Sequence, residues 1–218
     1  MKISKGAKLL ILGVSLVIID QIIKYLVKTQ MGLYEEINLI GEWFKLKFVL
    51  NDGMAFGMLI GGVIGKAVLS VFRIVLFGGL CWWITRLIKK QEAPVGVLVG
   101  LTLITAGALG NIIDCLFYGI IWPDPVVGDI MYNVNGEMVA RPISEYLYVT
   151  SAPFKFMFGK VVDMFYIPYR LPWMSEPAPL FGGIFNFADA CVSCGAVYLL
   201  LFQYKFFAKS EKKQEKVQ

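Results

Sequence analysis

Two acidic residues stand where the sequence offers a carboxylate little solvation. Asp163 lies within the apolar run Val161–Phe165, and Asp189 follows Phe187 at the start of a long apolar stretch. A purely structural role for both is hard to defend, since ionisable groups in apolar segments are costly and are functional candidates by default. Two carboxylates that share a site resist ionising together, so one can activate water while the other donates a proton to a carbonyl oxygen.

The rest of the composition excludes several kinds of catalytic chemistry. The chain has no histidine, which removes the commonest general base, the commonest metal ligand and every Ser-His or Cys-His pair. We expect no metal ion and no cofactor. The four cysteines lie in or beside apolar stretches and imply no disulfide framework. Cys191-x-x-Cys194 looks like a redox or metal motif, but we interpret both as small residues that pack in a helix.

Further polar residues interrupt the apolar stretches at helical spacing. They are Asp20 and Lys24 (i, i+4), Arg73, Asn111 and Asp114 (i, i+3), and Asn186 with Asp189 (i, i+3). Each also has a structural interpretation, which stays open at this point. Asp20 and Lys24 can form a plain intrahelical ion pair, and Arg73 can extend toward lipid headgroups. The asparagines can cap or bridge helices, and Asp114 can bond a helix end.

The elements that must position these residues are membrane spans. Hydrophobic residues make up 57% of the 218 residues and charged residues 17%, against about 25% charged residues in soluble domains. Four segments reach the roughly 20 apolar residues that a span needs. They run about 7–27, 66–87, 95–116 and 187–207. The first is too long for a signal peptide and contains Asp20 and Lys24, so we expect a retained helix.

Basic residues set the orientation of these spans. Lysines and arginines precede the first span, join the second to the third and follow the fourth, so both termini are predicted to be cytoplasmic. The connections at about 28–65 and 117–186 then face outward. Residues 43–50 of the first connection predict one or two strands, and the second is rich in proline and aromatic residues. We predict an all-α membrane protein with four transmembrane helices and a small extracytoplasmic, β-rich interfacial cap.

This topology brings the polar residues to one depth, near the outer leaflet, where five elements contribute to a single predicted site. Residues 1–208 are expected to form one membrane-embedded domain, followed by a basic cytoplasmic tail at 209–218. The basic residues are dispersed rather than interleaved with aromatic residues on one face, so we expect no nucleic-acid partner.

Five motifs in order now resemble those of the lipoprotein signal peptidases. They are Asp20-Gln21 with Lys24, Asn51-Asp-Gly53-Met-Ala55-Phe56-Gly57, Gly110-Asn111-Ile-Ile-Asp114, Val162-Asp163-Met-Phe165 and Phe185-Asn186-Phe-Ala188-Asp189. Each motif alone is weak, but the ordered set on a four-span frame is specific. The resemblance covers about residues 5–208.

The resemblance implies an aspartic endopeptidase with Asp163 and Asp189 as its catalytic pair. Asn51, Asn111 and Asn186 would support the substrate or the pair, and Asp20 and Asp114 match the family's other acidic positions. The implied substrates are prolipoproteins whose lipobox cysteine carries a diacylglyceryl group, cleaved just before that cysteine. The implied location is the bacterial cytoplasmic (inner) membrane, among membrane lipids, with the site near the outer leaflet. We expect activity as a monomer.

Three further hypotheses concern single segments. Gly53 and Gly57 could let the loop that carries Phe56 close over the scissile bond. The family usually has arginine where this chain has Cys115, and Arg73 is a candidate substitute. About 40 extra residues at 120–160 could widen the cap, bind a partner or gate substrate.

Two other function classes remain open. A small ion-coupled transporter could use the same acidic residues as a proton relay. A non-catalytic membrane scaffold could use the long outer connection to bind a partner.

Overall fold

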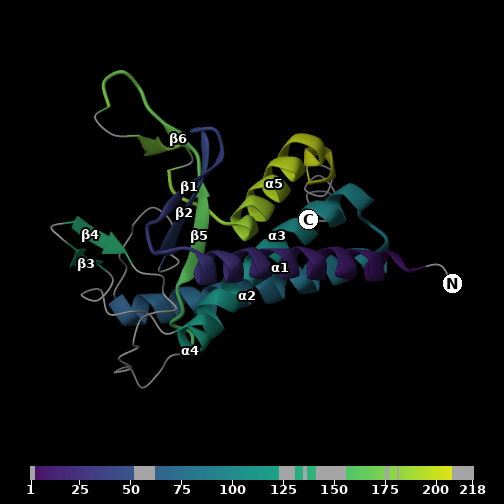
Figure 1. Cartoon of the computed structure of the whole chain (residues 1–218). Helices are drawn as coiled ribbons and strands as arrows, with labels where there is room; N and C mark the ends of the chain where they lie inside the picture. The colour runs from purple at the N-terminus through teal and green to yellow at the C-terminus, as the bar shows by residue number, and fades with distance from the viewer. Residues whose placement is uncertain are drawn as a thin grey trace.

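The computed structural model describes residues 3–51, 62–122, 131–134, 137–140, 156–174, 177–180 and 182–207. Gly53, Phe56, most of the extra segment at 120–160 and the tail at 209–218 lie outside these residues. The described part consists of long helices with a sheet at one end (Figure 1).

The predicted spans are all helical. α1 is Lys5–Gln30, α2 is Gly62–Lys90 and α3 is Val95–Ile113. The third continues through a π-helix, η2 (Asp114–Tyr118), and the short α4 (Gly119–Ile121). Lys5–Gln30, Lys66–Lys90 and Val95–Ile121 are each long and apolar enough to cross a membrane.

The fourth helix is shorter than the sequence suggests. α5 is Phe187–Phe202, 16 residues, or about 24 Å at 1.5 Å per residue. It ends because the backbone of Gln203 leaves helical geometry (φ −121°, ψ 7°), and helical turns resume at 204–207. The four-span count and the orientation of the termini therefore remain predictions.

α3 is the central helix of the bundle and packs against α1, α2 and α5. Glycines make its contact with α5 close. A Cβ on Gly107 would collide with the Ala188 carbonyl oxygen, and one on Gly110 would lie 2.6 Å from Asp20 Oδ2 and 3.0 Å from Ala188 Cβ. Small residues at such an interface let helix backbones approach each other.

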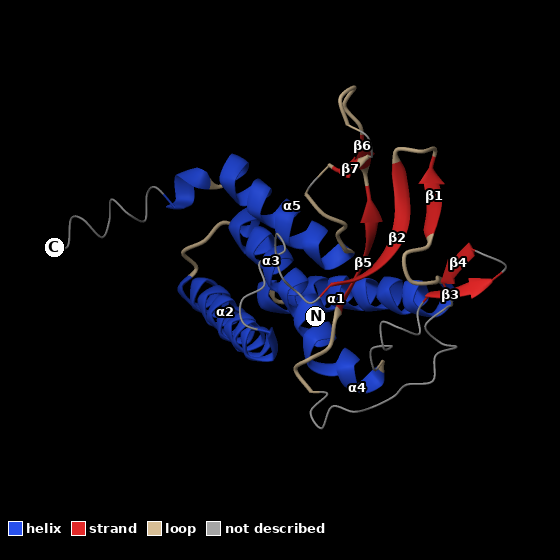
Figure 2. Ribbon diagram, turned by 90° about the vertical axis from the view of Figure 1, so that its left-hand side faces the viewer, coloured by secondary structure: helices blue, strands red, loops and turns tan. Residues whose placement is uncertain are grey.

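A three-stranded antiparallel sheet stands at one end of the helices (Figure 2). Its order is β1 (Glu36–Ile40), β2 (Phe44–Asn51) and β5 (Val161–Tyr166). β1 and β2 confirm that the first connection contains strands. β2 also pairs with β5, far away in sequence, so that Val49 is opposite Asp163 and Asn51 is opposite Val161.

Two small hairpins complete the described strands. β3 (Met131–Val134) pairs with β4 (Glu137–Ala140), and β6 (Pro168–Tyr169) pairs with β7 (Ala178–Pro179).

A buried apolar cluster fixes the sheet to the helices. Val27 and Met31 at the end of α1 pack with Phe48 of β2 and Met164 of β5. Each of these side chains is at most 4% exposed, and burying such a side chain stabilises the fold by about 1.5–3 kcal/mol. The sheet is therefore a fixed part of the fold, and its strands can hold polar groups against the helix ends.

The chain returns to the helices beside η2. The amide of Met157 donates to the Leu116 carbonyl at 3.2 Å, and the amide of Gly159 donates to the Cys115 carbonyl at 2.9 Å. A π-helix is often found at functional sites, and here it offers carbonyl groups to a neighbouring segment. β5 begins two residues after Gly159, which places it against the end of the third span.

Candidate active site

The segment between β5 and α5 brings the two predicted aspartates to one place. Phe185 pairs with Phe165 of β5 through two backbone hydrogen bonds of 2.7 and 3.1 Å. Asn186 then caps α5: its side chain accepts from the Asp189 amide at 2.9 Å, and the Asp189 side chain accepts from the Asn186 amide at 3.2 Å. This reciprocal capping box fixes Asp189 in the first turn of α5, beside the strand that carries Asp163.

Both carboxylate oxygens of Asp163 accept hydrogen bonds from asparagine amides. Asn186 Nδ2 donates to Oδ1 at 2.7 Å, and Asn51 Nδ2 donates to Oδ2 at 2.9 Å. Asn51 can reach this group because it ends β2, which pairs with β5. Asn186 therefore contacts both aspartates, Asp163 through its amide nitrogen and Asp189 through the capping box.

Asn111 of α3 connects Asp189 to the rest of the site. Its Nδ2 donates to Asp189 Oδ1 at 2.8 Å, while its Oδ1 accepts from Lys24 Nζ and from Asn186 Nδ2, each at 3.0 Å. Two donors on the oxygen side leave only one orientation of the amide that satisfies every partner. Lys24 thus helps to direct the Asn111 amide toward Asp189.

Burial changes the acidity of Asp163, which is 2% exposed. Desolvation, followed by the charge of Asp189, raises the pKa of Asp163 from 3.8 to about 7, against the opposing effect of the hydrogen bonds from Asn51 and Asn186. Asp163 therefore keeps its proton to a higher pH than an exposed aspartate does.

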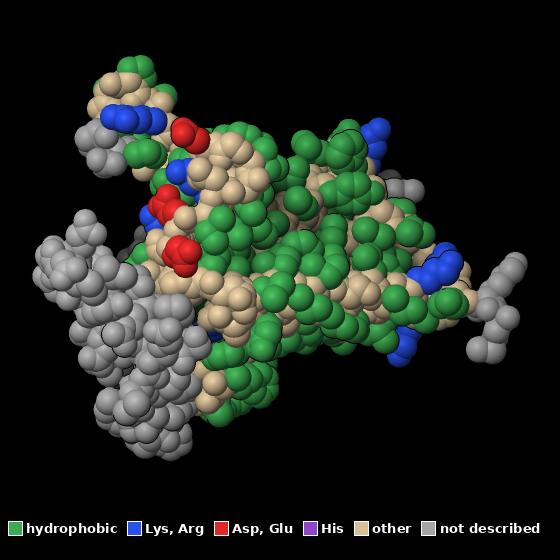
Figure 3. All heavy atoms as spheres, in the orientation of Figure 1, with side chains coloured by type: hydrophobic (Ala, Val, Ile, Leu, Met, Phe, Trp, Pro, Cys, Tyr) green, Lys and Arg blue, Asp and Glu red, His purple; other side chains and the backbone are tan. Residues whose placement is uncertain are grey.

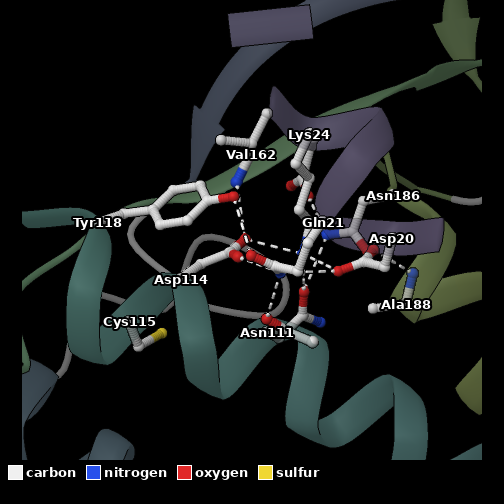
Figure 4. Close-up of polar contacts among 12 residues, drawn as sticks. Asp20, Gln21, Lys24, Asn111, Asp114, Cys115, Tyr118, Val162, Asn186 and Ala188 are labelled. Atoms are coloured by element: carbon white, nitrogen blue, oxygen red, sulfur yellow. Dashed lines mark hydrogen bonds and ion pairs between the residues drawn. The ribbon is translucent and has the colours of Figure 1, made fainter. Parts of the chain in front are cut away.

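A buried ion cluster, drawn in Figure 4, is connected to this pair through Asn111. Lys24 Nζ is 2.9 Å from Asp20 Oδ2 and 2.8 Å from Asp114 Oδ2, and the Lys24 side chain is fully buried. The pair within α1 therefore extends to Asp114, where α3 joins η2. A buried ion pair stabilises a fold only when its remaining polar atoms are also bonded.

The two carboxylates of this cluster also accept hydrogen bonds from backbone amides of β5 and α5, the elements that carry Asp163 and Asp189. Asp20 Oδ1 accepts from the Ala188 amide at 2.9 Å, and Asp114 Oδ2 accepts from the Val162 amide at 3.3 Å. Asp20 therefore contacts the start of α5 one residue before Asp189, and Asp114 contacts β5 one residue before Asp163. The cluster fixes the relative position of both acidic residues.

The structure brings together eight of the eleven predicted site residues: Asp20, Lys24, Asn51, Asn111, Asp114, Asp163, Asn186 and Asp189. Arg73 instead donates to Cys115 Sγ at 3.1 Å, and in Figure 4 no dashed line joins Cys115 to the carboxylates. Arg73 thus reaches the residue that stands in the family's arginine position. Gly53 and Phe56 lie outside the described residues.

Two residues of the site are absent from the predicted set. Gln21 Nε2 contacts Asp20 Oδ2, the Gly110 carbonyl and Asp114 Oδ1 at 3.0–3.2 Å, and Gln21 Oε1 accepts from the Tyr118 hydroxyl at 3.0 Å. Gln21 is part of a recognised motif and lies three residues before Lys24, so helical spacing could have identified it. Tyr118 could not be told from other aromatic residues near the membrane surface.

No group of three or more acidic or cysteine side chains in the described part of the chain is arranged to hold a metal ion. The described residues also contain no buried side-chain nitrogen or oxygen without a hydrogen-bond partner. The polar network is therefore closed, and the described carboxylates, amides and Lys24 satisfy one another.

Fold and site together define a membrane protein with a pair of aspartates, one buried and one half-buried, at one end of its apolar helices. The signal peptidase (SPase) II family model matches residues 12–205. A lipoprotein signal peptidase of Porphyromonas gingivalis is 36% identical over 209 residues, which cover 92% of this chain and 84% of that protein. One of Amoebophilus asiaticus is 33% identical over 194 residues, which cover 85% and 72%. The chain belongs to the signal peptidase II family.

Solved structures agree with this assignment at the level of the fold. Two bacterial membrane enzymes each align with a TM-score of 0.55, at 19% and 21% sequence identity. The alignments cover 93% and 89% of this chain and 90% of each neighbour. The chain is therefore a multi-pass membrane protein of a protease family.

Proposed function

We propose that this protein is an aspartic endopeptidase that removes signal peptides from diacylglyceryl-modified prolipoproteins, with cleavage just before the lipidated cysteine. One observation carries the proposal: Asn186 hydrogen-bonds both Asp163 and Asp189, and thereby holds the buried Asp163 and the half-buried Asp189 in one site. The lipoprotein signal peptidases to which the chain is similar supply the substrate class.

The roles of the two aspartates follow from their surroundings. Asp189 lies in the first turn of α5 and accepts from Asn111 Nδ2 and the Asn186 amide, and a helix N-terminus favours a negative charge. Asp163 is the member whose pKa is raised to about 7. Asp189 thus acts as the base that activates water, and Asp163 acts as the acid.

The reaction then proceeds in two steps. Asp189 takes a proton from water as the water oxygen bonds to the scissile carbonyl carbon, and Asp163 gives its proton to the carbonyl oxygen. The C–N bond of the resulting tetrahedral species breaks as the protonated Asp189 gives its proton to the leaving nitrogen. Asp163 recovers a proton from the hydroxyl group that becomes the new carboxyl group.

The position of the site suits a substrate held in lipid. On the face seen in Figure 3, apolar side chains form a band, acidic and basic side chains both occur at the sheet end, and the charged side chains in view at the opposite end are all basic. The basic end is cytoplasmic by the positive-inside rule, so the carboxylate pair faces the outer leaflet of the inner membrane. A diacylglyceryl anchor would hold the substrate cysteine at that depth and supply proximity.

The test is cleavage of a diacylglyceryl-modified prolipoprotein by the purified protein in detergent. Asp163→Asn and Asp189→Asn are compared with wild type and with Glu36→Gln. Glu36 is a matched control because it is an acidic residue of β1 that pairs with Lys47 at the protein surface. We expect wild type and Glu36→Gln to cleave, and both aspartate variants to be folded and inactive.

Other results separate the parts of the proposal. Full cleavage by either aspartate variant would refute the assigned pair while leaving the peptidase intact. Failure of folded wild type on a lipidated substrate would refute the function and favour a transporter or a scaffold.

A further inference from the structure

A long apolar groove lies on the half of the bundle away from the sheet. α1 and α2 both pack against α3 but make little contact with each other. The space between them has a volume of about 540 Å³. Its walls include Leu9 and Val14 of α1 and Ile84 and Ile88 of α2, with Ala106 of α3 among the residues between them.

The lining of the groove suits hydrocarbon. Three threonines line it, but each hydroxyl already donates to a backbone carbonyl four residues earlier in its own helix. The bonds are Thr85 to Cys81, Thr102 to Leu98 and Thr105 to Leu101, each 2.7 Å. These side chains therefore do not require a polar partner, and an occupant with no hydrogen-bonding groups leaves nothing unsatisfied.

The length of the groove matches one leaflet. On α1 its lining runs from Gly6 to Ile18, or about 18 Å along the helix axis. Half of the hydrocarbon core of a bilayer is about 15 Å. An acyl chain of one leaflet fits this depth, whereas a signal-peptide helix must cross both leaflets.

The charge at one end of the groove also favours a lipid as its occupant. Lys89 lines the groove at the end away from the sheet, and Lys5 and Lys8 flank the residues of α1 that line that end. The lining residues include neither aspartate nor glutamate. The nearby Glu92 pairs with Lys90 at 3.7 Å. A basic n-region of a signal peptide would be repelled here, whereas a lipid phosphate would be attracted.

We propose that this groove binds one phospholipid of the cytoplasmic leaflet, with an acyl chain between α1 and α2 and an anionic headgroup at Lys89. The bound lipid fills the space between two helices that otherwise make little contact with each other. It thereby supports α1, which carries Asp20 and Lys24. The proposal is independent of the peptidase reaction, because neither the groove nor its basic end includes a residue of the carboxylate site.

The test is native mass spectrometry of delipidated protein in detergent, with phosphatidylglycerol or phosphatidylcholine added back. Both lipids carry a phosphate, but only phosphatidylglycerol has a net negative charge. We expect wild type to retain one phosphatidylglycerol in preference to phosphatidylcholine. Lys89→Gln should reduce this retention about fivefold. Lys90→Gln is the matched control because Lys90 is adjacent and does not line the groove.

A second variant tests the acyl-chain position without changing charge. Thr85→Phe should fill the groove and reduce retention of both lipids. Val75→Phe places the same ring on an exposed position of α2 outside the groove and should retain lipid as wild type does. Equal retention of the two lipids by wild type, equal retention by Lys89→Gln and Lys90→Gln, or wild-type retention by Thr85→Phe would overturn the proposal.

Discussion

Replacing Lys24 with methionine should destabilise the protein more than any change to a surface charge. Lys24 Nζ lies 2.8–3.0 Å from Asp20 Oδ2, Asp114 Oδ2 and Asn111 Oδ1, and the side chain is fully buried. Methionine is apolar and of similar shape, so little of the effect should come from an altered volume. The change instead leaves two buried carboxylates without their cation, and breaking a buried pair costs about 3–5 kcal/mol.

Equilibrium unfolding in mixed detergent micelles measures this loss. Lys47→Met is the matched control, because Lys47 pairs with Glu36 where both side chains are about one-third exposed, and such pairs contribute about 0–1 kcal/mol. Asp114→Asn in the Lys24→Met background should recover part of the loss, since it removes one unpaired buried charge. The view that Lys24 compensates these carboxylates would be refuted by either of two results. One is a free energy of unfolding of Lys24→Met within about 1 kcal/mol of the wild-type value, and the other is no recovery of that free energy in the double variant.

Three further outcomes follow from the same geometry. Gly110→Ala should lower both stability and activity, because the added Cβ would lie 2.6 Å from Asp20 Oδ2. Gly78→Ala on α2 meets nothing within 4 Å and should be neutral or stabilising by up to about 1 kcal/mol in the same unfolding assay. For Asp163, a folded-state pKa of about 7 against 3.8 means that the folded state binds the extra proton, so this residue reduces stability as pH rises between those values. The free energy of unfolding of Asp163→Asn, relative to that of wild type, should therefore increase between about pH 5 and pH 8. A difference in free energy that does not change with pH would exclude a raised pKa of Asp163. The pH profile of kcat/KM should also fall on its basic side near 7, where Asp163 loses its proton, and a profile flat to pH 9 would exclude that role.

The sequence predicted the helices and the strand of the first connection well, because span length and composition carry that information locally. Long apolar runs identified α1, α2 and α3, and the spacing of Asp20 with Lys24 and of Asn111 with Asp114 placed them on shared helix faces. The predicted alternating direction of the spans was enough to predict that these groups lie at the same end of the helices.

Other features depend on contacts that no local pattern records. The pairing of β2 with β5, which brings Asn51 to Asp163, joins residues 112 positions apart. The π-helix at Asp114–Tyr118 has no distinctive local sequence, and α5 ends at Phe202, inside the stretch at about 187–207 that was predicted as one span. Tyr118 acquires its role only because η2 turns it toward Gln21.

The hydrogen bonds at η2 have a consequence for how this family can change. The Trp122 amide donates to the Tyr118 carbonyl at 2.7 Å and the Met157 amide donates to the Leu116 carbonyl at 3.2 Å, while the rings of Phe156 and Phe117 have centroids 5.9 Å apart. Both ends of the intervening segment are thus attached to the same short stretch of backbone. Each doubling of such a loop adds only about 0.6 kcal/mol of closure entropy. We therefore expect that residues inserted or deleted between these two points leave β5 and Asp163 in place.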